Sequence, residues 1–223
     1  MPVLKDLKML ISLNNPTWFY TGIPRTGSQA IYLAAQQINK RIITPFARHW
    51  PNPPPDWFME TNPKSIISIR NPYTRAVSCW MGFRTSEPRR SFKEQLEAAQ
   101  AGFLPWLKNA YGHYKKTKVA WPSVYTKVAC QPQSLWLKRR KYDYVIKQET
   151  LQQDWNAAMV EIGLPEQRLR IDAVDQSARD LTKLPTKDWR YFYRFPGTKE
   201  LVEELWAEDF EALVTYYGEF EVP

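Results

Sequence analysis

Two short clusters of basic and hydroxyl side chains carry the groups best suited to chemistry in this chain. The first is Arg-Thr-Gly-Ser at residues 25–28, and the second is Arg70 followed eight residues later by Ser78. Guanidinium groups, hydroxyls and backbone N–H groups beside a glycine are all donors that bind phosphate or sulfate. The residue types therefore predict two anion-binding clusters.

The first cluster lies between a predicted strand and a predicted helix. Residues 18–21 (Trp-Phe-Tyr-Thr) are aromatic or β-branched, which favours a buried strand, and apolar residues recur with helical spacing from Ile31 to Ile38. A turn that opens directly into a helix leaves backbone N–H groups unpaired and directs the positive end of the helix dipole outward. The alternative is an ordinary strand-to-helix turn with Ser28 as its N-cap.

The turn departs from the common nucleotide-binding pattern G-x-x-x-x-G-K-[ST]. Gly22 and Gly27 have the required spacing, but Ser28 stands where that pattern has lysine. The sequence therefore does not support a standard ATP or GTP loop.

Two further strand-helix units follow. Residues 64–70 form an apolar strand that ends in arginine, Pro72 suits the first position of the next helix, and residues 142–147 form a third apolar strand. Thr150 and Gln153 are predicted to cap the helix after it. Repetition of this unit predicts an α/β fold: a single domain over residues 1–223, with a central parallel sheet flanked by helices and a P-loop-like nucleotide-binding architecture.

The remaining segments have weaker patterns. Residues 44–63 are proline-rich and predict a long surface connection, and a capping pattern at Ser91 predicts a helix that stops at Gly102. Residues 103–133 mix aromatic and basic side chains without a clean period, and are predicted to be an irregular acceptor-binding surface. Residues 198–217 predict one final helix.

Composition limits the class of protein. The hydrophobic content of 43% is enough for a core, and 31 Lys plus Arg against 23 Asp plus Glu give a net charge of +8, which implies an anionic partner. Cys79 and Cys130 are predicted to be buried thiols, and neither they nor the two histidines suggest a metal site. We find no signal-peptide or membrane-spanning segment, and expect a soluble, cytoplasmic protein.

In a parallel sheet, both anion-binding clusters would lie beyond the carboxyl ends of their strands, where α/β proteins bind ligands. A ligand with phosphate-type groups at both ends of a nucleoside would match two clusters better than a nucleoside triphosphate would.

At these residues the chain resembles the sulfotransferases that use 3′-phosphoadenosine 5′-phosphosulfate (PAPS), most closely the branch that sulfates carbohydrates. Residues 23–28 (IPRTGS) resemble the 5′-phosphosulfate loop of that family, and residues 69–78 (IRNPYTRAVS) resemble its 3′-phosphate motif. The resemblance implies sulfate transfer to a hydroxyl, without a metal, with 3′,5′-adenosine bisphosphate as the product. It implies the following donor-binding residues: Arg25, Thr26, Gly27, Ser28, Gln29, Arg70 and Ser78.

The resemblance also implies catalytic roles. The family usually has lysine at the position of Arg25; arginine keeps the charge but cannot readily donate a proton. His49, in the proline-rich connection, is the candidate base that accepts the proton of the acceptor hydroxyl, with packing or surface exposure as the alternative. Asp56 and Glu60 could substitute for it, and His113 is a weaker candidate.

Several other residues resemble family positions or could contact ligand. The segment 144–151 with Asp154, and residues 208–210, resemble family positions that we expect to be structural, and Arg75 could pair with a carboxylate. Trp50, Trp57, Trp106 and Trp121 could stack on sugar rings or belong to the core. Arg190 and Arg194 could close over a nucleotide, with surface charge as the default.

Two rival functions remain open. One is a small-molecule kinase with a divergent phosphate loop, which would depend on magnesium. The other is a catalytically inactive module that binds an anionic polysaccharide or nucleic acid, although no regular nucleic-acid motif is present. The expected partner is a small-molecule or oligosaccharide acceptor rather than nucleic acid or a membrane.

Overall fold

The computed structural model of the chain describes residues 9–12, 18–38, 60–84, 93–117, 130–138, 140–169 and 188–223. The chain divides into two compact units, each made from two stretches of sequence. The first unit comprises residues 1–70 and 136–174, and the second comprises residues 71–135 and 175–223. One domain over residues 1–223 stays a prediction.

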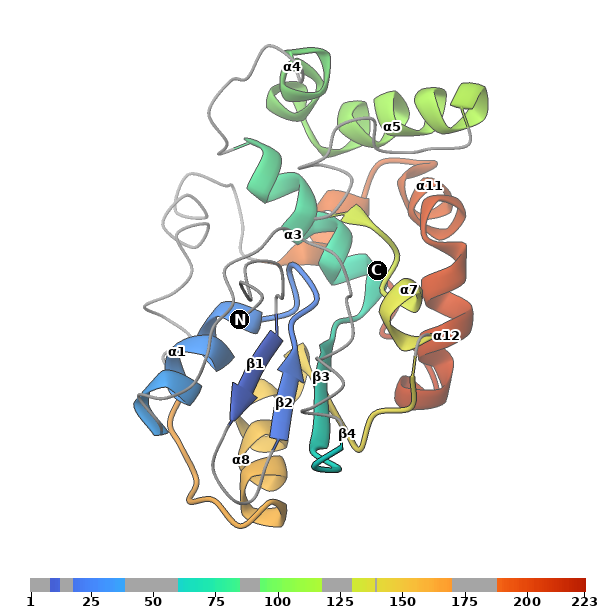
Figure 1. Cartoon of the computed structure of the whole chain (residues 1–223). Helices are drawn as coiled ribbons and strands as arrows, with labels where there is room; N and C mark the ends of the chain where they lie inside the picture. The colour runs from blue at the N-terminus through green and yellow to red at the C-terminus, as the bar shows by residue number, and fades with distance from the viewer. Residues whose placement is uncertain are drawn as a thin grey trace, which may run out of the picture. The chain divides into compact units, whose positions relative to one another are not determined.

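The first unit is built on a mixed sheet with the strand order β1-β2-β3-β4 (Figure 1). The strands are β1 (Met9–Ser12), β2 (Trp18–Thr21), β3 (Lys64–Ile69) and β4 (Tyr144–Lys147). β2, β3 and β4 run parallel, as predicted, whereas β1 pairs antiparallel with β2. The sequence patterns did not predict β1. The parallel part of the fold is therefore confirmed, and the sheet is mixed rather than wholly parallel.

Two helices, α1 (Ser28–Ile38) and α8 (Leu151–Glu161), share a core with one face of this sheet. Successive residues of a strand point to opposite faces, so alternate positions supply this core. The strand residues in it are Trp18, Tyr20, Ile66 and Ile146. This packing confirms that helices flank the sheet.

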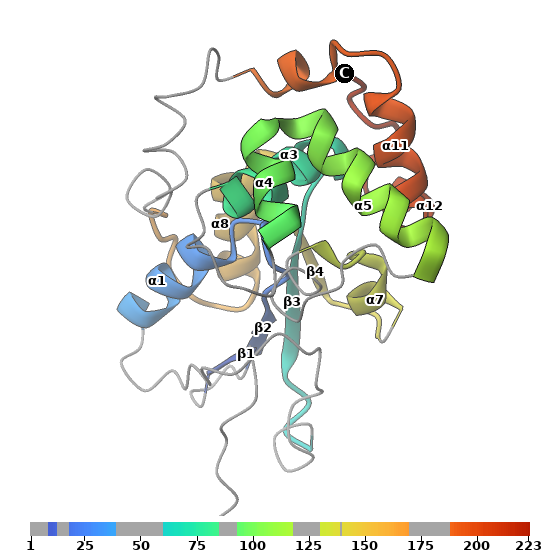
Figure 2. The same cartoon turned by 90° about the horizontal axis from the view of Figure 1, so that it is seen from above.

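The second unit is helical in the described residues (Figure 2). Its elements are α3 (Pro72–Arg84), α4 (Lys93–Ala101), α5 (Phe103–Thr117), the short 3₁₀ helix η3 (Trp189–Tyr193), α11 (Thr198–Leu205) and α12 (Ala207–Tyr217). α7 (Ser134–Leu137) lies where the chain passes into the first unit. A core rich in aromatic rings joins α3, α5, η3 and α11, and α5 lies beside α11.

The prediction of irregular structure from residue 103 onward was wrong for residues 103–117, which form α5. The helix buries Phe103, Trp106, Leu107 and Ala110, which have the i, i+3, i+4, i+7 spacing of one helical face. The abundance of other aromatic and basic residues obscured this period in the sequence. Trp106 is a core residue with 1% exposure rather than a sugar-stacking surface.

The prediction of a single helix over residues 198–217 was also wrong. The chain breaks at Trp206, where φ is −125° and ψ is 30°, and α12 begins at the next residue. The Trp206 indole is buried and donates its Nε1–H to the carbonyl of Cys130 at 2.8 Å. We infer that this tertiary contact favours the break, because amphipathic spacing alone would continue the helix.

Candidate anion-binding site

The candidate site in the first unit is the loop of residues 22–27 between β2 and α1. The Gly27 carbonyl accepts the backbone N–H groups of Ala30, at 3.1 Å, and Ile31, at 3.5 Å, so the helix starts immediately after the loop. The backbone N–H groups of a helix's first turn have no partner within the helix, and the helix dipole adds positive potential there. The predicted order of strand, loop and helix is confirmed, and it forms a geometry suited to an anion.

A chain of three hydroxyls fixes this loop to the sheet. Thr26 is fully buried; its hydroxyl donates to the Ile23 carbonyl at 2.7 Å and lies 2.6 Å from Ser68 Oγ. Ser68 Oγ in turn lies 2.5 Å from the Tyr20 hydroxyl. Burial raises the pKa of the Tyr20 hydroxyl well above its usual value, so the phenol remains protonated and able to donate. The Thr26 side chain therefore ties the loop to β3 through Ser68.

The sequence missed Tyr20 and Ser68 as parts of the site. Their one local signal is polarity, because Ser68 interrupts an apolar strand and Tyr20 carries the hydroxyl of an otherwise apolar run. Tyr20 lies opposite Ile66 in the parallel register, which brings Ser68 to the same face of the sheet as Tyr20.

Replacing Ser68 with alanine should lower the free energy of unfolding by about 1–3 kcal/mol, because the buried Tyr20 and Thr26 hydroxyls lose a partner. Urea denaturation would measure the loss. In a Tyr20→Phe background the same change should cost less, since the phenol is already absent. Equal costs in both backgrounds would contradict a coupled hydroxyl chain.

Arg25 adopts a backbone conformation that is unusual for a side chain of its size. Its φ is +69°, in the left-handed region, and its carbonyl accepts a hydrogen bond from Arg70 Nη1 at 3.3 Å. Non-glycine residues in this region cost free energy and persist only where neighbouring contacts hold them, often at functional sites. The guanidinium of Arg70 thus supports the loop that displays Arg25, and both positive side chains lie at the carboxyl ends of adjacent parallel strands.

Both glycines of the loop are closely packed. A Cβ at Gly27, whose φ is +80°, would lie 2.8 Å from Leu151 Cδ2, and a Cβ at Gly22 would lie 2.4 Å from the Tyr32 hydroxyl. Such distances force a neighbour to move. The loop is therefore packed between α1 and the beginning of α8.

The turn after β4 completes this end of the sheet. It passes through the 3₁₀ helix η2 (Gln148–Thr150) into α8. Asp154 accepts the Lys147 backbone N–H at 2.8 Å and the Thr150 hydroxyl at 2.7 Å. The predicted capping of α8 by the Thr150 side chain was wrong, because that hydroxyl bonds to Asp154 and makes no cap hydrogen bond. A structural role for Asp154 is confirmed.

Ser78, the second candidate of the Arg70 cluster, lies on α3 in the second unit and is half-buried. α3 begins at Pro72, as predicted, and Asn71 caps it by accepting the Tyr73 backbone N–H at 2.9 Å. The remaining predicted donor-binding residues lie at the start of α1, where Ser28 is half-buried and Gln29 is exposed.

Arg75 has a structural partner in the second unit. Its Nη1 lies 3.5 Å from Asp209 Oδ2, and its Nη2 donates to the Gln131 carbonyl at 2.8 Å. Both side chains are buried, and Asp209 also accepts the Ser134 backbone N–H at 2.9 Å. Burial raises the pKa of the Asp209 carboxyl to about 6, although the neighbouring Arg75 acts to lower it. The expectations that Arg75 pairs with a carboxylate and that Asp209 is structural are confirmed.

The proposed base His49 and its substitute Asp56 lie outside the described residues, as do Trp50, Trp57 and Trp121. Glu60 is exposed in a turn before β3, and His113 is half-buried on α5. The two cysteines are buried and free, as predicted.

The late arginines have surface partners. Arg190 pairs with Asp188 and Glu221, and Arg194 lies over the rings of Tyr191 and Phe195.

Within the described part of the chain, no cluster of three or more His, Cys, Asp or Glu side chains could hold a metal ion. No helix of that part combines the length and apolarity needed to cross a membrane.

Comparison of the chain with protein-family models, curated proteins and solved structures finds no match.

Proposed function

We propose that the protein is a sulfotransferase that moves a sulfuryl group from PAPS to a hydroxyl, with a carbohydrate as the expected acceptor. The observation that carries the proposal is the loop of residues 22–27. Its two glycines are closely packed, it opens into α1, and it is supported by Ser68 of β3 and by Arg70, which follows β3. Fixed donors of this kind suit an anionic group held in one orientation.

The loop chemistry favours a sulfate donor over a nucleoside triphosphate. Ser28 occupies the position where a triphosphate-binding loop has its lysine, which contacts the β- and γ-phosphates. Backbone groups of residues 25–29 would hold the 5′ end of the donor, and Arg70 and Ser78 would bind its 3′-phosphate. The assignment of Ser78 rests on the resemblance of residues 69–78 to the family motif.

In the proposed reaction the acceptor oxygen attacks sulfur in line with the oxygen that bridges sulfur and phosphorus. The new S–O bond forms as the bridging S–O bond breaks, and adenosine 3′,5′-bisphosphate leaves with the electron pair. Arg25 would stabilise the negative charge that develops on this leaving group, as cations do in phosphoryl transfer. The proton of the acceptor hydroxyl would pass to His49.

A second candidate is a catalytically inactive module that binds a polyanion. The net charge of +8 and the arginine at position 25 favour it, because both features support anion binding without requiring proton donation. Such a module would bind polyanions with an affinity that falls steeply as salt concentration rises. It would show no sulfate transfer.

Calorimetric titration should show that adenosine 3′,5′-bisphosphate binds at least about tenfold more tightly than ATP, with or without magnesium, because two separated anions match two clusters. ATP binding that is equally tight and depends on magnesium would instead support a kinase. Failure of both nucleotides to bind, together with salt-sensitive binding of heparin, would support the inactive module.

Two serine variants can separate the two ends of the donor in the same titration. Ser78→Ala should weaken binding of the bisphosphate but not of adenosine 5′-phosphosulfate, which has no 3′-phosphate. Ser28→Ala should weaken binding of both ligands. An equal effect of Ser78→Ala on both ligands would argue against its assignment to the 3′-phosphate.

A further inference from the structure

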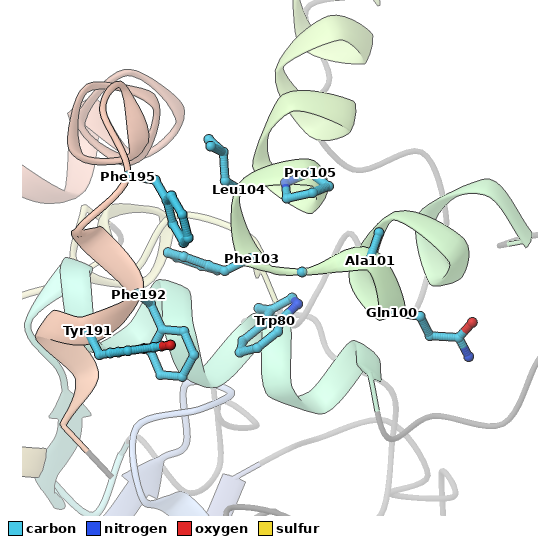
Figure 3. A pocket seen from close by; sticks show the side chains of 10 residues that line it. Trp80, Gln100, Ala101, Phe103, Leu104, Pro105, Tyr191, Phe192 and Phe195 are labelled. Carbon is cyan, nitrogen blue, oxygen red and sulfur yellow. The ribbon is translucent and has the colours of Figure 1, made fainter. Parts of the chain in front are cut away.

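The second unit contains a cavity of about 440 Å³ whose lining includes none of the residues assigned to the sulfate donor (Figure 3). Its walls come from α3, from the junction of α4 and α5 around Gly102, and from η3 with the residues that follow it. We call it the aromatic pocket. Its volume lies within the range of pockets that hold small organic molecules.

Three rings that are almost fully buried form the base of the aromatic pocket. The ring centroid of Trp80 lies 5.7 Å from that of Phe103 and 5.1 Å from that of Phe192, and Phe103 and Phe192 are 6.1 Å apart. All three pairs are tilted or edge-to-face, an arrangement that favours ring packing. The base is therefore a buried apolar surface suited to another ring.

The aromatic pocket offers few polar groups to a ligand. The indole N–H of Trp80 donates to the Ala99 carbonyl at 2.9 Å, so it already has a partner. Gln100 and Tyr191 are the lining residues with polar side-chain ends. A sugar would leave most of its hydroxyls unpaired against such walls, which carries a free-energy penalty. The lining favours a planar apolar ligand.

The positively charged side chain of Arg194 lies beside the aromatic pocket. The guanidinium carbon of Arg194 lies 3.7 Å from the ring centroid of Tyr191 and 4.8 Å from that of Phe195, and both rings line the pocket. Arg194 and Phe195 are exposed, and Arg194 forms no ion pair with any described residue. A positive charge held over two rings can attract an anionic substituent on a ligand that enters between them.

We propose that the aromatic pocket binds a small planar aromatic anion, with its ring against Trp80, Phe103 and Phe192 and its anionic group beside Arg194. The apolar base supplies binding through burial of the ring, and the arginine selects for charge. This site lies wholly within the second unit, and its ligand binding does not depend on the proposed sulfate transfer.

Calorimetry with 2-naphthalenesulfonate would test the proposal, with 2-naphthol as the uncharged analogue and glucose 6-sulfate as an anion without an aromatic ring. We expect the sulfonate to bind at least about threefold more tightly than the naphthol, as one exposed charge contact allows. Glucose 6-sulfate should not bind to this site. No measurable binding of the sulfonate, or tighter binding of the sugar sulfate, would overturn the proposal.

Exposed residues provide variants that should leave the fold intact. Phe195→Ala should weaken sulfonate binding about fivefold through lost ring contact, and Ala101→Trp should weaken it more by filling the aromatic pocket. Arg194→Gln should weaken binding of the sulfonate but not of the naphthol. The matched control Arg168→Gln, an exposed arginine of the first unit, should change neither. Unchanged sulfonate affinity in the folded Phe195 and Ala101 variants would overturn the assignment.

Discussion

Replacing Arg75 with methionine should lower the free energy of unfolding by about 3–5 kcal/mol at pH 8, because it leaves the buried Asp209 carboxylate without its ionic partner. The wild-type pair is fully enclosed, with Arg75 Nη1 3.5 Å from Asp209 Oδ2. A buried charge without its partner carries the full free-energy cost of its removal from water, because no opposite charge offsets that cost. Urea denaturation followed by near-ultraviolet circular dichroism would measure the loss.

The loss of unfolding free energy caused by Arg75→Met should become smaller as the pH falls. Burial already raises the pKa of Asp209 from 3.8 to about 6, and removing Arg75 removes a charge that acts to lower it. A carboxyl whose folded-state pKa is raised contributes stability that is fully present below its unfolded pKa and is lost as the pH rises through its folded pKa. The variant should therefore be closer to the wild type at pH 5 than at pH 8.

A second substitution controls for the lost packing of the arginine side chain. Adding Asp209→Asn to Arg75→Met removes the unpaired charge, so the double variant should recover much of the stability at pH 8 and lose the pH dependence. If the double variant were as unstable as the single variant at both pH values, packing rather than charge would explain the effect.

The strand, loop and helix of residues 18–38 were predictable because their signals are local. Apolar spacing identifies α1, glycine marks the turn, and the carboxyl ends of neighbouring parallel strands bring the loop of residues 22–27 beside Arg70. The hydrogen bond from Arg70 to the Arg25 carbonyl confirms that Arg70 lies beside this loop. The left-handed backbone of Arg25 gave no signal in the sequence, since arginine rarely adopts it.

The contacts that fix the loop were not predictable, because they join distant parts of the chain. Tyr20 and Thr26 meet Ser68 across separations of 48 and 42 residues, and no local pattern specifies such a pair. The break at Trp206 has the same origin, since the indole bonds to Cys130 76 residues away. α5 differs, because its helical spacing was present in the sequence and was missed among neighbouring aromatic residues.

Replacing Arg25 with asparagine should abolish most donor binding without lowering stability. Asparagine accepts the left-handed conformation more readily than arginine, so the change should relieve backbone strain at φ +69°. Loss of the guanidinium should weaken binding of adenosine 3′,5′-bisphosphate about 10- to 100-fold, the effect of losing a charge-assisted hydrogen bond. Calorimetry and thermal unfolding of the same preparation would measure both quantities.

Arg25→Lys is the matched control, because it keeps the positive charge and restores the residue usual in the family that the loop resembles. It should bind the bisphosphate within about tenfold of the wild type, since a point charge replaces a fork of donors. Binding by Arg25→Asn at the wild-type level would remove Arg25 from the donor site. Weak binding by Arg25→Asn together with a large fall in its melting temperature would instead indicate that Arg25 stabilises the loop, because strain relief predicts no such fall.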